Sequence, residues 1–158
     1  MISMPAIVQE REVPAHITAA GAMDRPDYVD LFTVVAGQAP GRSPEEWART
    51  ALSGAGVGGQ ILWRIVLGLR LEPSPDAIGG WTIGDRTPTW IRLEADSWLL
   101  RAHVVFSLDG ERLSVATIIR YERPFAALVW SLASVVHRRA MPYLLSRAVA
   151  KLSEGSEG

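Results

Sequence analysis

Residues 76–122 read DAIGGWTIGDRTPTWIRLEADSWLLRAHVVFSLDGERLSVATIIRYE, and this stretch decides the fold. The segment contains four β-type runs separated by short turn sequences: 77–83, 89–95, 99–108 and 112–121. The pair Asp109-Gly110 is a strong signal for a tight hairpin between the last two runs. Strands that follow one another through short turns pair antiparallel. The sequence therefore predicts an antiparallel meander in the second half of the chain.

The predicted sheet has two unlike faces. In the third run the even-numbered positions from Leu100 to Leu108 are apolar, whereas Arg101, His103 and Ser107 occupy the other side. We expect the apolar face to cover a core and the mixed face to meet water.

A long apolar helix follows the last predicted strand through Pro124. At 100° per residue one broad apolar stripe is expected to pack on the sheet: Phe125, Leu128, Val129, Leu132, Val135, Val136, Ala140 and Tyr143. Ser131, Ser134 and Arg138 lie opposite. Arg139 falls inside the stripe, so its guanidinium is expected to extend to an exposed edge, to pair with an acid such as Asp30 or Glu94, or to meet a ligand in a cavity.

The first half of the chain is predicted to contain one strand and two helices. Residues 1–27 are punctuated by prolines and are expected to be a loosely ordered arm or loop with at most a short strand, and residues 28–35 alternate as a two-faced strand. Ser43-Pro44 predicts a helix start, with the helix extending to Leu52. Glycines at 54–59 are expected to form a flexible joint, and residues 60–71 a core helix.

Composition excludes several classes of function. The chain has 158 residues, 48% hydrophobic content, a formal net charge of -1 and no cysteine. These values predict a single soluble domain over residues 1–158, with a flexible tail at 153–158, no nucleic-acid partner and no thiolate chemistry. His16, His103 and His137 are scattered over different elements, so no metal site is expected, and no cofactor is implied. The cytoplasm is the default location.

Short motifs along the chain resemble one protein family. They are Val13-Pro14-Ala15-His16, Asp27-Tyr28-Val29-Asp30, Arg120-Tyr121-Glu122-Arg123-Pro124, Trp130, and His137 followed by Pro142. In these motifs and in its element order the chain resembles an uncharacterised bacterial family of the START or polyketide-cyclase-like (SRPBCC) helix-grip superfamily. Members of that family occur alone or fused behind NAD(P)-binding, epimerase-like domains. No nucleotide-binding half is present here, so NAD(P) is not carried over.

The resemblance implies an α+β helix-grip fold, in which a curved antiparallel sheet wraps the C-terminal helix around an apolar cavity. It also implies a hydrophobic small-molecule ligand. On this basis the expected ligand-binding residues are Arg139, Trp98, Trp130, Tyr143, Tyr121, Phe106, Leu132 and Val135.

The resemblance brings no catalytic set with it. His137 with Asp30 or Glu94 could nevertheless act as an acid–base pair. The alternative is that His137 and Asp30 make structural hydrogen bonds and that Trp130 fills the edge of the core.

Three functions follow as hypotheses. The first is a non-catalytic binder or carrier of a lipid-, polyketide- or isoprenoid-like molecule. The second is a small cyclase or isomerase that acts on such a ligand by acid–base catalysis. The third is an interaction module with a filled core and an exposed patch around Leu62, Trp63 and Val66 that buries in a homodimer. No membrane-spanning helix is expected, because the longest apolar runs are far shorter than the roughly 20 residues that span a bilayer. Interfacial contact by residues 60–71, where Trp63 adjoins Arg64, is the less favoured alternative to a buried helix, because many positions are apolar around its whole circumference.

Overall fold

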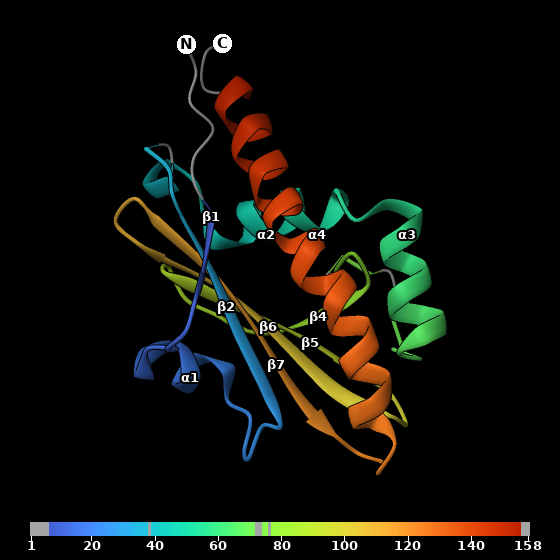
Figure 1. Cartoon of the computed structure of the whole chain (residues 1–158). Coiled ribbons are helices and arrows are strands. Elements are labelled where there is room, and N and C mark those ends of the chain that lie inside the picture. The colour runs from blue at the N-terminus through green and yellow to red at the C-terminus, as the bar shows by residue number, and fades with distance from the viewer. Residues whose placement is uncertain (1–6, 38, 72–73, 76, 156–158) are drawn as a thin grey trace.

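The structure is a computed structural model that describes residues 7–37, 39–71, 74–75 and 77–155. Over these residues seven strands form one antiparallel sheet in the order β1-β2-β7-β6-β5-β4-β3. The strands are β1 (Ile7–Glu10), β2 (Tyr28–Val35), β3 (Ala77–Ile78), β4 (Trp81–Arg86), β5 (Trp90–Asp96), β6 (Leu100–Asp109) and β7 (Arg112–Tyr121). The sheet is curved and does not close into a barrel (Figure 1).

Five helical elements precede the long C-terminal helix in the sequence. They are α1 (Ala15–Gly21), η1 (Ala39–Gly41), α2 (Pro44–Ser53), α3 (Gly56–Ile61) and the π-helical turn η2 (Leu62–Val66). The C-terminal helix, α4, extends over Ala126–Gly155 and lies across the concave side of the sheet (Figure 1). This arrangement confirms the predicted α+β fold with a helix-grip layout. Residues 1–6 of the predicted arm and 156–158 of the predicted tail lie outside the described residues.

The meander is confirmed, with one difference at its beginning. The β6–β7 hairpin pairs Asp109 with Arg112 around Gly110, as the Asp-Gly signal indicates. The run predicted over 77–83 is instead divided into β3 and β4 by a turn at Gly79-Gly80, whose φ angles are 61° and 92°. Both angles lie in the region that favours glycine, so two strands form where one was expected.

Both faces of the sheet are covered. The larger core lies under α4 and includes Phe106, whereas a second cluster of Ile17, Ala20, Leu31, Val105, Ala116 and Ile118 lies under α1. The last carbonyls of α1 are held by the sheet: Arg92 donates to the Ala20 carbonyl over 2.8 Å, and Nδ1 of His103 lies 2.7 Å from the Gly21 carbonyl oxygen. The prediction that the mixed face of the sheet meets water was therefore wrong, because α1 covers it. The prediction of a loosely ordered arm was also wrong at Ala15–Gly21, where this helix forms.

The glycine-rich segment differs from its prediction. Helix α3 begins at Gly56, inside the expected joint, and the helical segment ends with η2 at Val66 instead of continuing to residue 71. Gly68 has a φ of 65°, a left-handed conformation that ends helices. Leu67, Leu69 and Leu71 then enter the core from non-helical chain.

The orientation of α4 is the largest correction. Its sheet-facing side carries Ala126, Trp130, Ala133, Ser134 and Met141, all buried, whereas Leu128 is 67% exposed and Leu132 70% exposed. The apolar stripe predicted to pack on the sheet mostly faces outward, and Ser134, predicted to lie opposite it, is buried. We call the exposed residues the outer stripe: Phe125, Leu128, Leu132, Val135, Val136 and Tyr143.

Charge explains why the outer stripe stays outside. Arg139 belongs to it by helical spacing and is exposed, with no ion pair or hydrogen bond to any described residue, so neither Asp30 nor Glu94 is its partner. Turning the stripe inward would bury the guanidinium, and burying a charged group without a partner costs roughly several kcal/mol.

Among the described residues no helix has both the length and the apolar character required to cross a membrane.

The turn at Gly79-Gly80 generates a test of the fold. Gly80→Ala should lower the free energy of unfolding by about 3 kcal/mol, because alanine disfavours a φ of 92° and its Cβ would lie 2.7 Å from the Cβ of Leu71. Gly110→Ala is the matched control, since its φ is 59° but nothing lies near the added Cβ. That variant should lose only about 1 kcal/mol. Urea denaturation measures both, and equal losses would contradict the packing at Gly80.

Candidate functional site

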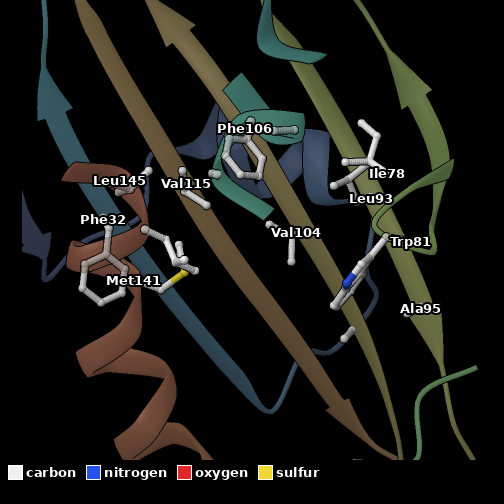
Figure 2. Packing of buried hydrophobic residues seen from close by; sticks show 14 of the residues in the cluster. Phe32, Ile78, Trp81, Leu93, Ala95, Val104, Phe106, Val115, Met141 and Leu145 are labelled. Atoms are coloured by element: carbon white, nitrogen blue, oxygen red, sulfur yellow. The ribbon is translucent and has the colours of Figure 1, made fainter. Parts of the chain in front are cut away.

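A cavity of about 310 Å³ lies between the sheet and α4. Helices α2 and α4, the α3–η2 segment and strands β4, β6 and β7 contribute to its wall. Phe106 and Val104 project from β6, Trp81 from β4 and Met141 from α4, all on the same side of the sheet (Figure 2). The wall is largely apolar, and the cavity opens beside Val136 and Tyr143 of α4, two residues that are half exposed or more.

Four buried polar atoms without a hydrogen-bond partner belong to residues that line this cavity. In the described structure they are Trp81 Nε1, Thr117 Oγ1, Trp130 Nε1 and His137 Nε2, the last of which makes no hydrogen bond but contacts the carboxylate of Asp30. A buried polar group without a partner costs about 1–3 kcal/mol, and such groups are rare in folded proteins. Because they gather around a single cavity, this wall can offer hydrogen bonds to a bound molecule.

A buried carboxylate contacts His137 of the cavity wall. Asp30, on β2, is 4% exposed and accepts hydrogen bonds from the Tyr28 hydroxyl over 2.7 Å and from the Thr117 backbone N–H over 3.3 Å. Nε2 of His137, from α4, lies 2.9 Å from Oδ2 of Asp30. The distance is that of a direct contact between the two side chains, although the pair does not form a hydrogen bond. Strand β2, strand β7 and helix α4 meet at this carboxylate.

Aromatic rings enclose the Asp30 cluster. The indole of Trp130 packs edge-on against Tyr28 at 5.1 Å and lies 5.5 Å from the ring of His137, both measured between ring centroids. Burial, together with the charge and hydrogen bond of Asp30, raises the pKa of the Tyr28 hydroxyl above its ordinary value of 10.0, and Arg138 partly opposes this shift. Tyr28 therefore stays a neutral hydrogen-bond donor to Asp30.

The candidate acid–base residues are separated by the sheet. His137 and Asp30 come together on the α4 side, as one of the two predicted pairings requires. Glu94 projects to the α1 side, where Arg92 donates to its carboxylate over 2.8 Å and Nε2 of His103 lies 3.8 Å away. The pairing of His137 with Glu94 was therefore wrong. Side chains alternate along β5, so Leu93 and Ala95 face the α4 side, where His137 lies, whereas Glu94 between them faces α1.

The predicted ligand-binding residues fall into two groups. Phe106, Trp130 and Tyr143 line the cavity. The remaining five do not line it: Arg139, Leu132 and Val135 are exposed on α4, Trp98 is exposed against Phe125, and Tyr121 is half-buried at the end of β7. Whether any of the eight contacts a ligand stays a prediction.

Several residues of the cavity were missed from the sequence. Trp63 and Trp81 pack edge to face at 5.7 Å between ring centroids and form one side wall. The sequence did contain a signal for Thr117, because it is the polar residue on a strand face that is otherwise apolar, with Leu113, Val115 and Ile119. A threonine surrounded by core residues indicates either a buried hydrogen bond or a ligand contact.

The fold and the cavity together define an α+β protein of helix-grip layout with an internal, mostly apolar cavity. No family model matches the chain, and no curated protein or solved structure matches it significantly. Within the described residues no group of three or more His, Asp or Glu side chains is placed to hold a metal ion.

The unpartnered hydroxyl of Thr117 predicts that Thr117→Val stabilises the fold. Valine has nearly the same shape and removes a hydroxyl without a partner, so the free energy of unfolding should rise by about 1 kcal/mol. Thr33→Val is the matched control, because the Thr33 hydroxyl is also buried but lies 3.2 Å from the Ser114 hydroxyl. That variant should lose about 1 kcal/mol by leaving Ser114 unpaired. Chemical denaturation compares the two, and a loss of stability in Thr117→Val would refute the assignment.

The Tyr28–Asp30 contact predicts a dependence of stability on alkaline pH. Because the folded-state pKa of Tyr28 is raised, its contribution is fully present below the ordinary value of 10.0 and is lost as the pH rises above it. The difference in unfolding free energy between the wild type and Tyr28→Phe should be constant below that pH and shrink above it. Urea denaturation in a series of alkaline buffers measures this difference, and a constant value throughout would contradict it.

Proposed function

We propose that the protein binds a hydrophobic small molecule of lipid-, polyketide- or isoprenoid-like character in the cavity beneath α4, as a binder or carrier. The observation that carries the proposal is the combination of a mostly apolar wall with three unpartnered polar atoms on residues that line it, in Trp81, Thr117 and Trp130. Ligand pockets have this composition, in which apolar surface supplies affinity and a few polar groups fix orientation. An interaction module with a filled core is not favoured, because the cavity interrupts the core.

The size of the cavity limits the ligand. About 310 Å³ lies at the small end of the roughly 300–1,000 Å³ found for ligand pockets. A compact molecule of one to a few rings, or a short branched chain, fits this volume better than a two-chain lipid does.

The polar atoms define what the ligand must offer. Both indole nitrogens, in Trp81 and Trp130, can only donate hydrogen bonds, whereas the Thr117 hydroxyl can donate or accept. The ligand therefore carries oxygen acceptors such as carbonyl, ether or hydroxyl groups on an apolar frame. Small side-chain movements would bring these donors to the ligand, since each is covered in the structure.

Plugging the cavity provides the test. Native mass spectrometry of the purified protein, followed by denaturing extraction, should reveal a bound apolar molecule with oxygen functions. Ala140→Trp, at the half-buried cavity wall on α4, should abolish its retention, whereas the matched control Ala127→Trp, exposed on the same helix and away from the cavity, should retain it. If no apolar ligand is retained and none raises the melting temperature of the wild type, the binding function is wrong.

A second candidate function is favoured by the contact between His137 and Asp30. An imidazole held 2.9 Å from a buried carboxylate at a cavity wall has the positioning that general acid–base catalysis of a cyclisation or isomerisation requires. If the protein is an enzyme, His137→Gln should retain an extracted ligand that differs from the one retained by the wild type, namely the unconverted substrate. Identical ligands from both proteins, by tandem mass spectrometry, would favour the non-catalytic role.

A further inference from the structure

The outer stripe of α4 is an apolar surface that no described element covers. Its residues recur at helical spacing from Phe125 to Tyr143, which corresponds to about 27 Å of helix. Leu128, Leu132 and Tyr143 are 67%, 70% and 62% exposed. Trp98, itself 54% exposed, extends the surface at the beginning of α4 by packing against Phe125 with ring centroids 5.4 Å apart. Large contiguous apolar surfaces of this kind mark interaction sites.

The charges on α4 limit what can cover this surface. Between residues 126 and 152 the helix carries Arg138, Arg139, Arg147 and Lys151 and no acidic residue. All four cations are exposed, and Arg139 lies within the outer stripe, between Val135 and Tyr143. A partner that accepts apolar side chains and cations side by side must itself present an apolar layer next to negative charge.

A second copy of the chain does not meet this requirement. In a two-fold dimer built on the outer stripe the same surface faces itself, so the cations of one α4 would approach those of the other. Like charges brought together in this way oppose association. Arg139 lies near the middle of the helix, where the two copies would be closest.

We propose that the outer stripe docks on the surface of a bilayer that contains anionic lipids. Leu128, Leu132 and Val136 enter the boundary between headgroups and acyl chains, while Arg139 extends along them to lipid phosphates. Arg138 and Arg147 add long-range attraction to a negative surface. The helix lies in the plane of the membrane surface and does not cross it.

The cavity mouth shares residues with this surface. Val136 and Tyr143 belong to the outer stripe and also line the cavity. Docking would therefore place the opening of the cavity against the lipid, where an apolar ligand dissolves. The docking itself does not depend on the proposed ligand, because Leu128, Leu132 and Arg139 do not line the cavity.

Vesicle flotation tests the proposal with the full-length protein. The wild type should float with phosphatidylcholine vesicles that contain phosphatidylglycerol, float less with phosphatidylcholine alone, and be released by high salt. The double variant Leu128→Gln/Leu132→Gln should bind at least tenfold more weakly, since two exposed leucines no longer enter the bilayer. Arg139→Glu should weaken binding to anionic vesicles about tenfold.

Matched controls separate this surface from general effects. Val35→Gln replaces an equally apolar residue that is 56% exposed on β2, and Arg112→Glu reverses an exposed charge at the β6–β7 hairpin. Both should bind vesicles like the wild type. All the substituted side chains are exposed, so circular dichroism should show the fold unchanged.

Three results would overturn the proposal. The first is no flotation of the wild type with anionic vesicles. The second is equal flotation of the outer-stripe variants and the controls. The third is a dimer in native mass spectrometry that becomes a monomer in Leu128→Gln/Leu132→Gln, which would assign the surface to self-association. Ligand retention by the same double variant distinguishes this failure from a failure of the binding function, because its cavity residues are intact.

Discussion

The buried carboxylate of Asp30 is the constraint on which the arrangement of the molecule depends. It joins Tyr28 on its own strand, the backbone of Thr117 on β7 and the ring of His137 on α4. A carboxyl group buried without hydrogen-bond partners is unfavourable, so the three contacts offset the loss of its hydration. Because His137 has to face Asp30, the rotation of α4 about its own axis is set. Trp130, seven residues earlier and two turns away, then also faces the sheet.

The rotation of α4 determines both the cavity and the outer stripe. With Trp130 and His137 turned inward, the positions between them on the buried side are small, as at Ala133 and Ser134. Farther along the helix the small Ala140 lines the cavity, which extends to the α3–η2 segment. The larger apolar residues of the helix, such as Leu128 and Leu132, are on the opposite side. The contact between Asp30 and His137 and the charge of Arg139 thus favour the same rotation of α4.

Much of the fold could be predicted from the sequence, because its signals are local. The alternation of β2, the Asp-Gly hairpin between β6 and β7 and the Ser43 cap, whose hydroxyl accepts from the Glu46 N–H over 3.1 Å, each depend on neighbouring residues. The same reasoning placed Asp30 and His137 among the candidate residues, but it did not distinguish Asp30 from Glu94 as the partner. That distinction depends on which face of the sheet each strand position occupies, and therefore on long-range register.

The orientation of α4 was mispredicted for a related reason. A helical wheel finds an apolar stripe, but it cannot tell which of two apolar sides packs inward when Ala126, Trp130 and Ala133 lie opposite Leu128 and Leu132. The larger side chains of the outer stripe suggested that this side packs on the sheet. The position of Arg139 within the stripe indicates the opposite orientation, in which the stripe is exposed. An arginine in the middle of an apolar stripe, without an acid within reach on the same helix, is far cheaper to place at a surface than in a core.

The exposed apolar side of α4 contributes little to the stability of the isolated chain. Burying a leucine side chain stabilises a fold by about 1.5–3 kcal/mol, and Leu128 and Leu132 keep most of their surface in water. This hydrophobic free energy is available to a second surface instead. Since Val136 and Tyr143 belong to the outer stripe and to the cavity wall, whatever covers the stripe also controls access to the cavity. If the protein binds a ligand in the cavity and docks on a membrane through the outer stripe, as proposed, the two events would be coupled through these two side chains of α4.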